Sequence, residues 1–314
     1  MLSSAAIQAF ISEQYQLEPI ETWVELATTF HRLYLIHTSA TAFVLRISSA
    51  DPESLRFDEA RLTLLSALAA ADVPVVQPIQ RRDSGYSGPF TPADYPCVAA
   101  LYAYVPGLTP GRTITAAQSG AFGRALARLH HATSDGSASC NLPDLPDLDL
   151  IDQPAAVIAA WPDFQHHTAL HSITTIAKQM LHTLPQTSAA FGFCHGDVHP
   201  MNVIINAENV TLLDFEWSGY GWRSYDLATF LWAIGGTPAM PQLRDSFLDG
   251  YQTIRSLTAQ ERAMLPLFMG LRHLLLTSKI ISYAQVGIDT GRAITTDFLG
   301  QRLAQVQRWF DAAE

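Results

Sequence analysis

The stretch FCHGDVHPMN (residues 193–202), followed by LLDFE (residues 212–216), decides how this sequence is interpreted. Four residues separate Asp197 from Asn202, and one short apolar segment precedes Asp214. A carboxylate, an amide and a second carboxylate therefore follow one another in a fixed order. Three chemically related positions in this order are more specific than a lone His-x-Asp triplet.

This order of side chains is the one that phosphoryl transfer requires. One carboxylate can orient and deprotonate a hydroxyl, while an amide and a second carboxylate hold Mg²⁺ against the phosphates of ATP. We therefore interpret the pattern as that of an ATP-dependent kinase with ATP and Mg²⁺ as cofactors. A turn-forming role for Asp197 after Gly196 is the simpler alternative, and the presence of Asn202 and Asp214 argues against it.

The predicted elements indicate an α+β fold with two lobes. Residues 1–104 are rich in strand-like segments, and VPG (residues 105–107) interrupts this pattern before the mostly helical residues 105–314. The first lobe would bind the nucleotide, and the second would carry the catalytic loop and the acceptor site. Strands are expected at 32–38, 41–48 and 95–104, with at most an edge strand at 73–79, and helices at 3–15, 51–70, 114–131, 169–184, 259–286 and 295–313.

HGDVHPMN (195–202) together with DFE (214–216) resembles the aminoglycoside phosphotransferase and choline kinase superfamily, small-molecule relatives of the protein kinases. The run GWRSYDLA (221–228) adds to the match. The resemblance covers the order of elements over nearly the whole chain and implies the two-lobed protein-kinase-like fold. Its specific motifs lie within residues 193–228.

The resemblance also implies roles for individual residues. Asp197 would be the catalytic base that accepts the proton of the acceptor hydroxyl, and Asn202 and Asp214 would ligate Mg²⁺ through hard oxygen atoms. His195 would brace the catalytic loop by hydrogen bonding. Glu216 could face the magnesium, face the acceptor or cap a turn.

Three residues in or near the motif have structural or rival interpretations. His195 and His199 could instead be metal ligands of a hydrolase, but the further His or acidic ligands that such a site needs are not evident nearby. Asp226 is interpreted as structural, either capping a helix that starts near Leu227 or tying down the catalytic loop.

The first lobe departs from the kinase pattern. No lysine precedes Lys178, so the usual phosphate-clamping lysine is absent, and Arg46 occupies the corresponding strand position. Strand alternation places Arg46 opposite the apolar face, where its guanidinium could hold phosphate oxygens with Glu59 as its partner. A surface ion pair of little energetic value is the alternative.

The other nucleotide contacts are expected from the backbone. Residues 25–32 contain no glycine, although backbone amides there usually approach the phosphates, and the hydroxyls of Thr28 and Thr29 could substitute. The segment near residues 101–105, with Leu101 and Ala103, should hydrogen-bond adenine through its backbone groups.

Composition limits the partners. With 314 residues, 48% of them hydrophobic, the chain can bury a large core, and its net charge of −10 argues against nucleic acid. No apolar run reaches the length of a membrane span, and the first residues do not resemble a signal peptide. We expect a cytoplasmic monomer or homodimer. Its three cysteines should be reduced: Cys97, Cys140 and Cys194.

The acceptor is left open by the sequence. A small-molecule alcohol is favoured, of the aminoglycoside, choline or ethanolamine, homoserine or sugar type, and an aromatic pocket holding a cationic acceptor would make physical sense. Trp217, Tyr220, Trp222 and Trp232 could line such a pocket or belong to the core. A bacterial stress-response-type protein Ser/Thr kinase and a pseudokinase or nucleotide-binding scaffold are the alternatives.

Overall fold

The computed structural model describes residues 4–28, 31–49, 52–91, 96–134 and 147–313. These residues form two compact units. The first contains the described residues of Met1–Thr109 and Val203–Glu216, and the second contains those of Pro110–Ser137, Pro143–Asn202 and Trp217–Glu314. The chain thus leaves the second unit after Asn202 and re-enters it at Trp217.

The first unit is built on an antiparallel sheet of five strands in the order β1-β2-β3-β5-β4. The strands expected at 32–38, 41–48 and 95–104 are confirmed, whereas β1 and β4 were not expected. Residues 73–79 form isolated bridges at Val75 and Pro78 but no strand. The strands are β1 (Ile20–Thr28), β2 (Arg32–Thr38), β3 (Ala42–Ser49), β4 (Ser87–Phe90) and β5 (Cys97–Ala103).

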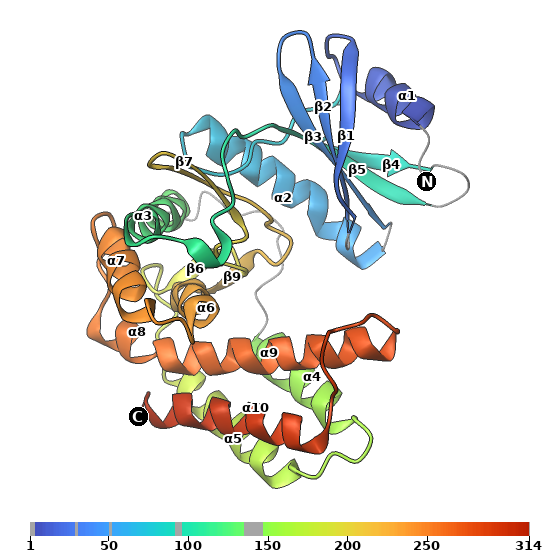
Figure 1. Ribbon diagram of the computed structural model, residues 1–314. Helices are drawn as coiled ribbons and strands as arrows, with labels where there is room; N and C mark the ends of the chain where they lie inside the picture. Colours follow the sequence, from blue (N-terminus) through green and yellow to red (C-terminus); the bar gives the residue numbers. More distant parts are fainter. Residues whose placement is uncertain (1–3, 29–30, 50–51, 92–95, 135–146, 314) are drawn as a thin grey trace. The chain divides into compact units, whose positions relative to one another are not determined.

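Side-chain alternation in β3 gives this sheet two different faces. Leu45 and its neighbours two residues away are buried in one core with Ile7 and Phe10 of α1 (Ser4–Gln14). Arg46 points to the other face and pairs with Asp58 of α2 (Pro52–Ala70). Figure 1 shows α1 and α2 beside this sheet. The expected helices at 3–15 and 51–70 are confirmed in the described residues.

A hairpin from much later in the sequence completes the first unit. It consists of β7 (Val203–Asn206) and β8 (Asn209–Leu212), which pair with each other. Leu212 bridges to Val75, and Ile205 bridges to Leu108. The first unit therefore extends to Thr109 and includes residues 203–216, which differs from the expected division between residues 104 and 105.

The second unit is mostly helical and is organised around α9 (Leu265–Gln285), which packs against α4, α6 and α10 (Figure 1). The strands β6 (Phe191–Cys194) and β9 (Gly219–Trp222) pair beside these helices. The other helices are the 3₁₀ turn η2 (Gly111–Thr113), α3 (Ala116–Ala132), α4 (Asp147–Ala159), α5 (His167–His182), α6 (Arg223–Ile234), α7 (Met240–Gln252), α8 (Ala259–Ala263) and α10 (Thr296–Asp311).

Local signals explain several helix ends. Thr115 and Gln118 form a capping box at the start of α3, which confirms the helix expected at 114–131. The expected helices at 169–184 and 295–313 correspond to α5 and α10. The helix expected at 259–286 is divided into α8 and α9, and a proline stands in the first turn of α9.

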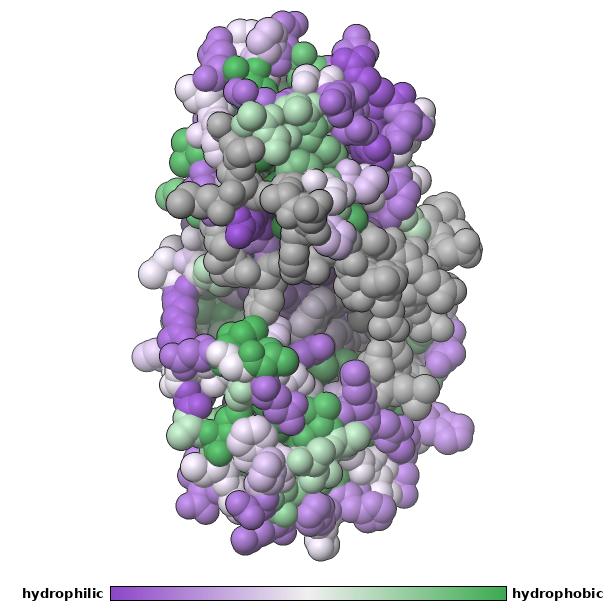
Figure 2. Space-filling view, turned by 90° about the vertical axis from the view of Figure 1, so that its right-hand side faces the viewer, coloured by the Kyte–Doolittle hydropathy of each residue, from purple (hydrophilic) through white to green (hydrophobic). Residues whose placement is uncertain are grey.

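The surface hydropathy and the cysteine thiols say little about the function of the protein. On the face drawn in Figure 2, hydrophobic residues form small groups between hydrophilic ones. None of the described helices is both long and apolar enough to span a bilayer. Cys97 and Cys194 are buried free thiols, as expected, and Cys140 lies outside the described residues.

Two glycines allow α3 and α7 to pack closely. A Cβ at Gly123 would lie 2.0 Å from the carbonyl oxygen of Phe247, and a Cβ at Gly250 would lie 2.0 Å from that of Gly120. Real Cβ atoms do not approach backbone oxygens so closely, so a larger residue must separate the helices. These two positions accept only glycine at the observed spacing.

We expect Gly123→Ala to lower the free energy of unfolding by about 1–3 kcal/mol, because overpacking outweighs the better helix propensity of alanine. Gly120→Ala is the matched control, since its Cβ would lie 3.3 Å from the carbonyl oxygen of Ser246. Urea unfolding of both variants measures the difference. Equal stabilities would show that α3 and α7 can separate without cost.

Candidate active site

The HGDVHPMN segment follows β6 and begins with a turn that requires glycine. Gly196 has a φ of +81°, and a Cβ there would lie 2.0 Å from the carbonyl oxygen of Trp217. Both the left-handed backbone and the close approach exclude a side chain. The glycine before Asp197 is thus dictated by local geometry.

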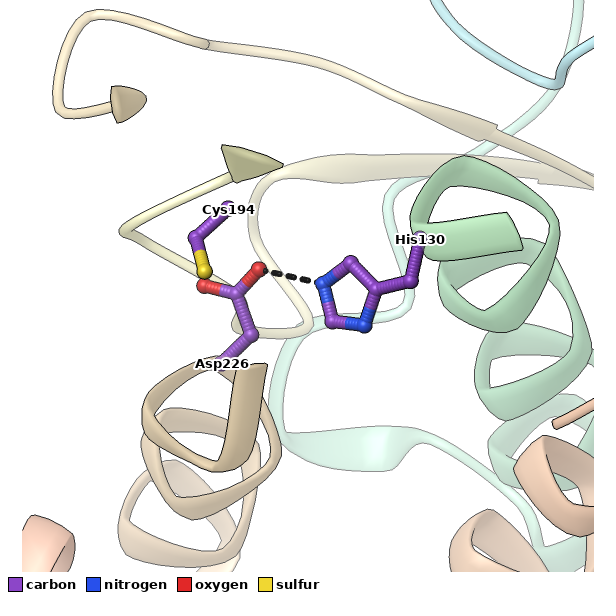
Figure 3. A group of neighbouring side chains, drawn as sticks. All are labelled: His130, Cys194 and Asp226. Carbon is purple, nitrogen blue, oxygen red and sulfur yellow. Dashed lines mark hydrogen bonds and ion pairs between the residues drawn. The ribbon is translucent and has the colours of Figure 1, made fainter. Parts of the chain in front are cut away.

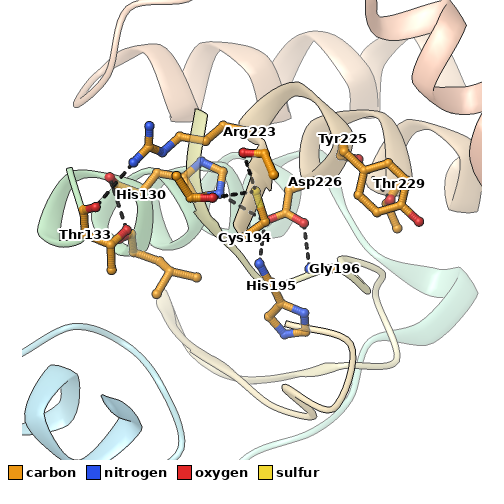
Figure 4. Close-up of polar contacts among 12 residues, drawn as sticks. His130, Thr133, Cys194, His195, Gly196, Arg223, Tyr225, Asp226 and Thr229 are labelled. Carbon is orange, nitrogen blue, oxygen red and sulfur yellow. Dashed lines mark hydrogen bonds and ion pairs between the residues drawn. The ribbon is translucent and has the colours of Figure 1, made fainter. Parts of the chain in front are cut away.

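Asp226 of α6 anchors this turn. Its carboxylate accepts hydrogen bonds from the backbone N–H groups of His195, at 2.7 Å, and Gly196, at 2.8 Å (Figure 4). His130 Nε2 of α3 lies 3.0 Å from the same carboxylate. Asp226 is fully buried, so these donors replace water around its charge. The expectation that Asp226 ties down the catalytic loop is confirmed.

The protonation of His130 follows from its partners. A carboxylate only accepts, so Nε2 carries the proton, while Nδ1 accepts from the hydroxyl of Tyr251 at 2.9 Å. Burial lowers the pKa of His130 to about 4. The ring is therefore neutral at pH 7 and acts as a fixed donor to Asp226.

His130, Cys194 and Asp226 also form a compact buried group with possible metal-ligating atoms within 4.8 Å of one another (Figure 3). Burial raises the pKa of the Cys194 thiol well above its usual value, so no thiolate is available there. The carboxylate and the imidazole already bind each other, and Asp226 also holds the loop amides. We interpret the group as a hydrogen-bonded core.

Asp197 and Asn202 lie together in the second unit. The Asn202 amide donates to the Asp197 carboxylate at 2.9 Å and to the Asp197 carbonyl oxygen at 3.1 Å. His195 Nδ1 accepts a hydrogen bond from the N–H of Asp197 at 3.3 Å, and the bracing role of His195 stays a prediction. Asp197 thus has a fixed backbone and a fixed side chain.

Two further groups contact the Asp197 carboxylate. Oδ1 pairs with Nη2 of Arg272, and Oδ2 lies 3.3 Å from His199 Nε2. His199 Nδ1 accepts from the N–H of Met201, so a neutral His199 carries its proton on Nε2, facing Asp197. Burial raises the pKa of Asp197, but Arg272 and His199 lower it more, and it lies well below its usual value.

Arg272 is a residue of this site that the sequence analysis missed. It lies in the middle of α9, is 3% exposed, and its Cζ stands 4.9 Å from the ring centroid of Trp217. The available signal was an arginine within the apolar run LFMGLRHLLL (267–276), because a buried guanidinium needs an anionic partner.

In the first unit, Arg46 is held by two carboxylates. Its guanidinium donates to Asp58 and to Glu216, each at 2.9 Å, and Glu216 also lies 2.9 Å from His31 Nε2. Burial raises the pKa of Glu216, but the hydrogen bond from His31 and the charge of Arg46 lower it more. The Glu216 carboxylate is therefore ionised at pH 7.

The expected pairing of Arg46 with Glu59 is wrong. Asp58 takes that place, because consecutive helix residues point about 100° apart and only one of the two can face Arg46. The Glu59 carboxylate accepts instead from the backbone N–H groups of Tyr86 and Ser87, both at 2.9 Å. Glu59 thus fastens α2 to the start of β4.

The other predicted nucleotide contacts lie in or near the sheet. The Leu101 carbonyl accepts from the N–H of Ile79 at 2.8 Å, and the Ala103 N–H donates to Gln77 at 2.9 Å. Thr28 ends β1, and Thr29 lies outside the described residues. Adenine binding by the backbone near residues 101–105 stays a prediction.

Asp214 has an unusual backbone. Its φ is +58°, a left-handed conformation that costs a residue with a Cβ about 1–2 kcal/mol, and its side chain is exposed. Asp214 belongs to the first unit, whereas Asp197 and Asn202 belong to the second. The convergence of these three side chains on one metal–nucleotide centre stays a prediction.

A cavity of about 470 Å³ opens beside Asp197 within the second unit. Its lining includes two of the residues that contact the Asp197 carboxylate, His199 and Arg272, together with Trp232 and Leu276. The second unit therefore offers space for a small molecule next to the groups that hold Asp197.

Comparison with known proteins identifies the family of this chain. Residues 27–265 match the model of the phosphotransferase enzyme family (APH), which is more than half of the chain and includes the whole HGDVHPMN segment. The chain belongs to this phosphotransferase family. The superfamily expected from residues 193–228 is confirmed.

Two proteins illustrate the sequence relatives of this chain. A protein from Synechocystis sp. is 33% identical over 235 residues, covering 73% of the chain and 64% of that protein. A homoserine kinase from Azorhizobium caulinodans is 28% identical over 250 residues, covering 74% of the chain and 71% of the kinase. The chain spans slightly less than two thirds of the length of the Synechocystis protein.

Solved structures support the fold of this chain. An amicoumacin kinase in complex with AMP-PNP, Ca²⁺ and its ligand has a TM-score of 0.77 at 17% identity, covering 98% of the chain and 93% of that protein. A microcompartment-associated aminopropanol kinase has a TM-score of 0.75 at 21% identity, covering 99% and 96%. The α+β kinase-like fold with a sheet lobe and a helical lobe is confirmed.

We expect Arg272→Met to raise the pKa of Asp197, because burial remains while the cation is lost. At pH 7 the variant should lose about 3–5 kcal/mol of stability, the usual cost of breaking a buried pair. The native pair stabilises the fold above the ordinary aspartate pKa of about 3.9, and this contribution disappears as the pH falls through the lowered pKa of Asp197. The stability difference should therefore shrink in acid.

An NMR titration of the aspartate carboxyl carbons measures this shift directly. Arg302→Met is the matched control, because the Arg302 guanidinium donates to Thr277 and not to Asp197. An Asp197 titration that is the same in Arg272→Met and in the native protein would remove Arg272 from the electrostatics of the loop.

Proposed function

We propose that this phosphotransferase moves the γ-phosphoryl group of ATP to a hydroxyl of a small molecule. The observation that carries the proposal is the Asp197 carboxylate, held ionised by Arg272 and His199 and hydrogen-bonded to Asn202. Family membership, the kinase-like fold and the cavity beside this carboxylate support it. The homoserine and aminopropanol kinases are named for small acceptors, which favours an acceptor of that size.

In this proposal Asp197 mainly orients the acceptor. Its lowered pKa makes it a weak base, but the transition state of phosphoryl transfer is loose and needs little early proton transfer. The acceptor oxygen bonds to the γ-phosphorus as the bond to the departing ADP oxygen breaks. The hydroxyl proton leaves through Asp197 to solvent.

Asn202 and Asp214 are proposed to hold Mg²⁺. Amide and carboxylate oxygens suit a hard cation, and the exposed Asp214 carboxylate on a strained backbone is the kind of group that function retains. When bound, Mg²⁺ would neutralise phosphate charge and orient the phosphates. The amicoumacin kinase carries a divalent cation and a nucleotide analogue, which supports this pairing of cofactors.

Arg46 is proposed to contact ATP phosphates in place of a lysine. Its guanidinium carries more donors than an ammonium, so it can keep Asp58 while it exchanges Glu216 for a phosphate oxygen. The pairing of Arg46 with Asp58 and Glu216 would also suit a nucleotide-binding scaffold that does not turn over ATP. An activity assay separates the two possibilities.

The test measures the release of ADP from ATP in the presence of each alcohol of a panel of candidate acceptors. We expect Asp197→Asn to lower kcat by about 10²–10⁴-fold, the range of a lost positioned acid or base, while ATP affinity changes little. The side-chain volume is kept, so circular dichroism should show a folded protein. Asp245→Asn, at an exposed aspartate of α7, is the matched control.

Each outcome has one meaning. Magnesium-dependent ADP release that Asp197→Asn abolishes supports the proposal. A variant that keeps most of its activity removes Asp197 from the mechanism. Nucleotide binding without ADP release for any acceptor would identify a scaffold and overturn the proposal.

A further inference from the structure

One face of α9 carries polar side chains at and beyond Arg272, which pairs with Asp197. Lys279 and Tyr283 follow Arg272 by seven and eleven residues, so each of them points within about 20° of Arg272 around the helix. Burial and, after it, the negative charge of Asp197 raise the pKa of Tyr283. Because Arg272 pairs directly with Asp197, the face with these three residues is turned toward Asp197.

Lys279 is unusual for its scarcity and its surroundings. The chain has only two lysines, Lys178 and Lys279. Lys178 pairs with Asp152 at the surface, at 2.6 Å. Lys279 is half-buried, its Nζ stands 5.7 Å from the ring centroid of Trp217, and no carboxylate of the described residues pairs with it. A partly buried ammonium without an anion is unfavourable and suggests that a ligand supplies one.

The charges around Trp217 indicate the sign of the charge that this ligand carries. The positive charge of Arg272 is already balanced by Asp197, which leaves Lys279 uncompensated. The sequence had suggested a cationic acceptor held by aromatic side chains. Here the ring of Trp217 already faces two cations of its own chain, so an acceptor that carries a cation but no carboxylate would be repelled there.

Space for a ligand lies along the same helix face. Leu276 is four residues after Arg272 and three before Lys279, and with Arg272 it lines the cavity beside Asp197. Arg272 and Lys279 both contact the ring of Trp217, so the Lys279 ammonium lies on the side of α9 that faces Asp197.

We propose that the acceptor is a hydroxy acid whose carboxylate is bound by the Lys279 ammonium beside Trp217, while its hydroxyl is held at Asp197. This inference rests on the proposed phosphotransferase function and names its substrate class. A carboxylate is favoured over a phosphate because one ammonium balances one negative charge, whereas phosphate sites gather several charge-assisted donors.

A matched pair of acceptors tests this assignment: homoserine and 3-amino-1-propanol, which is homoserine without its carboxylate. We expect the native protein to use homoserine with a KM lower by at least about tenfold, the scale of one charge-assisted contact. Lys279→Met should raise the homoserine KM about tenfold to a hundredfold with a smaller change in kcat. Lys279→Arg should restore part of this loss.

The second lysine provides the control. Lys178→Met removes the same charge at an ion pair on the surface and should leave the homoserine KM unchanged. Calorimetric titration of homoserine into the native protein and the two methionine variants gives a readout that does not depend on turnover. Binding by the native protein and by Lys178→Met, but not by Lys279→Met, would support the inference.

Failure of the inference differs from failure of the proposed function. Turnover of 3-amino-1-propanol as good as that of homoserine, or an equal loss with both acceptors in Lys279→Met, would overturn the hydroxy-acid assignment and leave the kinase intact. A Lys279→Met protein that is only less stable would show that Lys279 merely packs on Trp217, which also overturns it. Absence of ADP release with every acceptor contradicts the proposed function itself.

Discussion

The arrangement of the HGDVHPMN loop (195–202) depends on one buried carboxylate, that of Asp226. Asp226 accepts hydrogen bonds from the N–H groups of His195 and Gly196 and from the Nε2–H of His130, so three donors stabilise its charge. Losing one of these donors would leave a buried charge undersolvated, which costs more than an ordinary hydrogen bond. The turn at Gly196 is thereby fixed before any ligand arrives, and the direction of the Asp197 side chain follows from it.

The helices of the second unit supply Asp226 and also Arg272, the residue that pairs with Asp197. Asp226 comes from α6, His130 from α3 and Arg272 from α9, so three helices must pack together before the loop has its observed form. The Arg272–Asp197 pair keeps the carboxylate ionised but makes it a poor base. A rigid, weakly basic carboxylate suits a reaction in which the protein mainly positions groups and stabilises charge. In the proposed function, the cavity and Lys279 would select the acceptor.

Much of this could be predicted from the sequence, and the remainder has physical reasons. The β2 and β3 strands and the long helices were predictable because their apolar residues recur with the period of the element. The β1 strand was missed because it lies at the sheet edge and is largely exposed, so IETWVELAT shows little apolar alternation. The α4 helix contains Pro154, which opposes a helix prediction. The partners of Arg46 and Arg272 are set by tertiary contacts across 12 to 170 residues, which no local pattern encodes.

Native-state hydrogen exchange at the backbone amides of His195 and Gly196 tests the central claim most directly. If Asp226 holds the loop, these two amides exchange in the native protein as slowly as amides in the core of α9. In Asp226→Asn, which keeps one acceptor oxygen and adds a donor, they exchange at least about tenfold faster, while amides of α10 keep their rates. Fast exchange in the native protein, or equal rates in the two proteins, would mean that the loop is held by something other than this carboxylate.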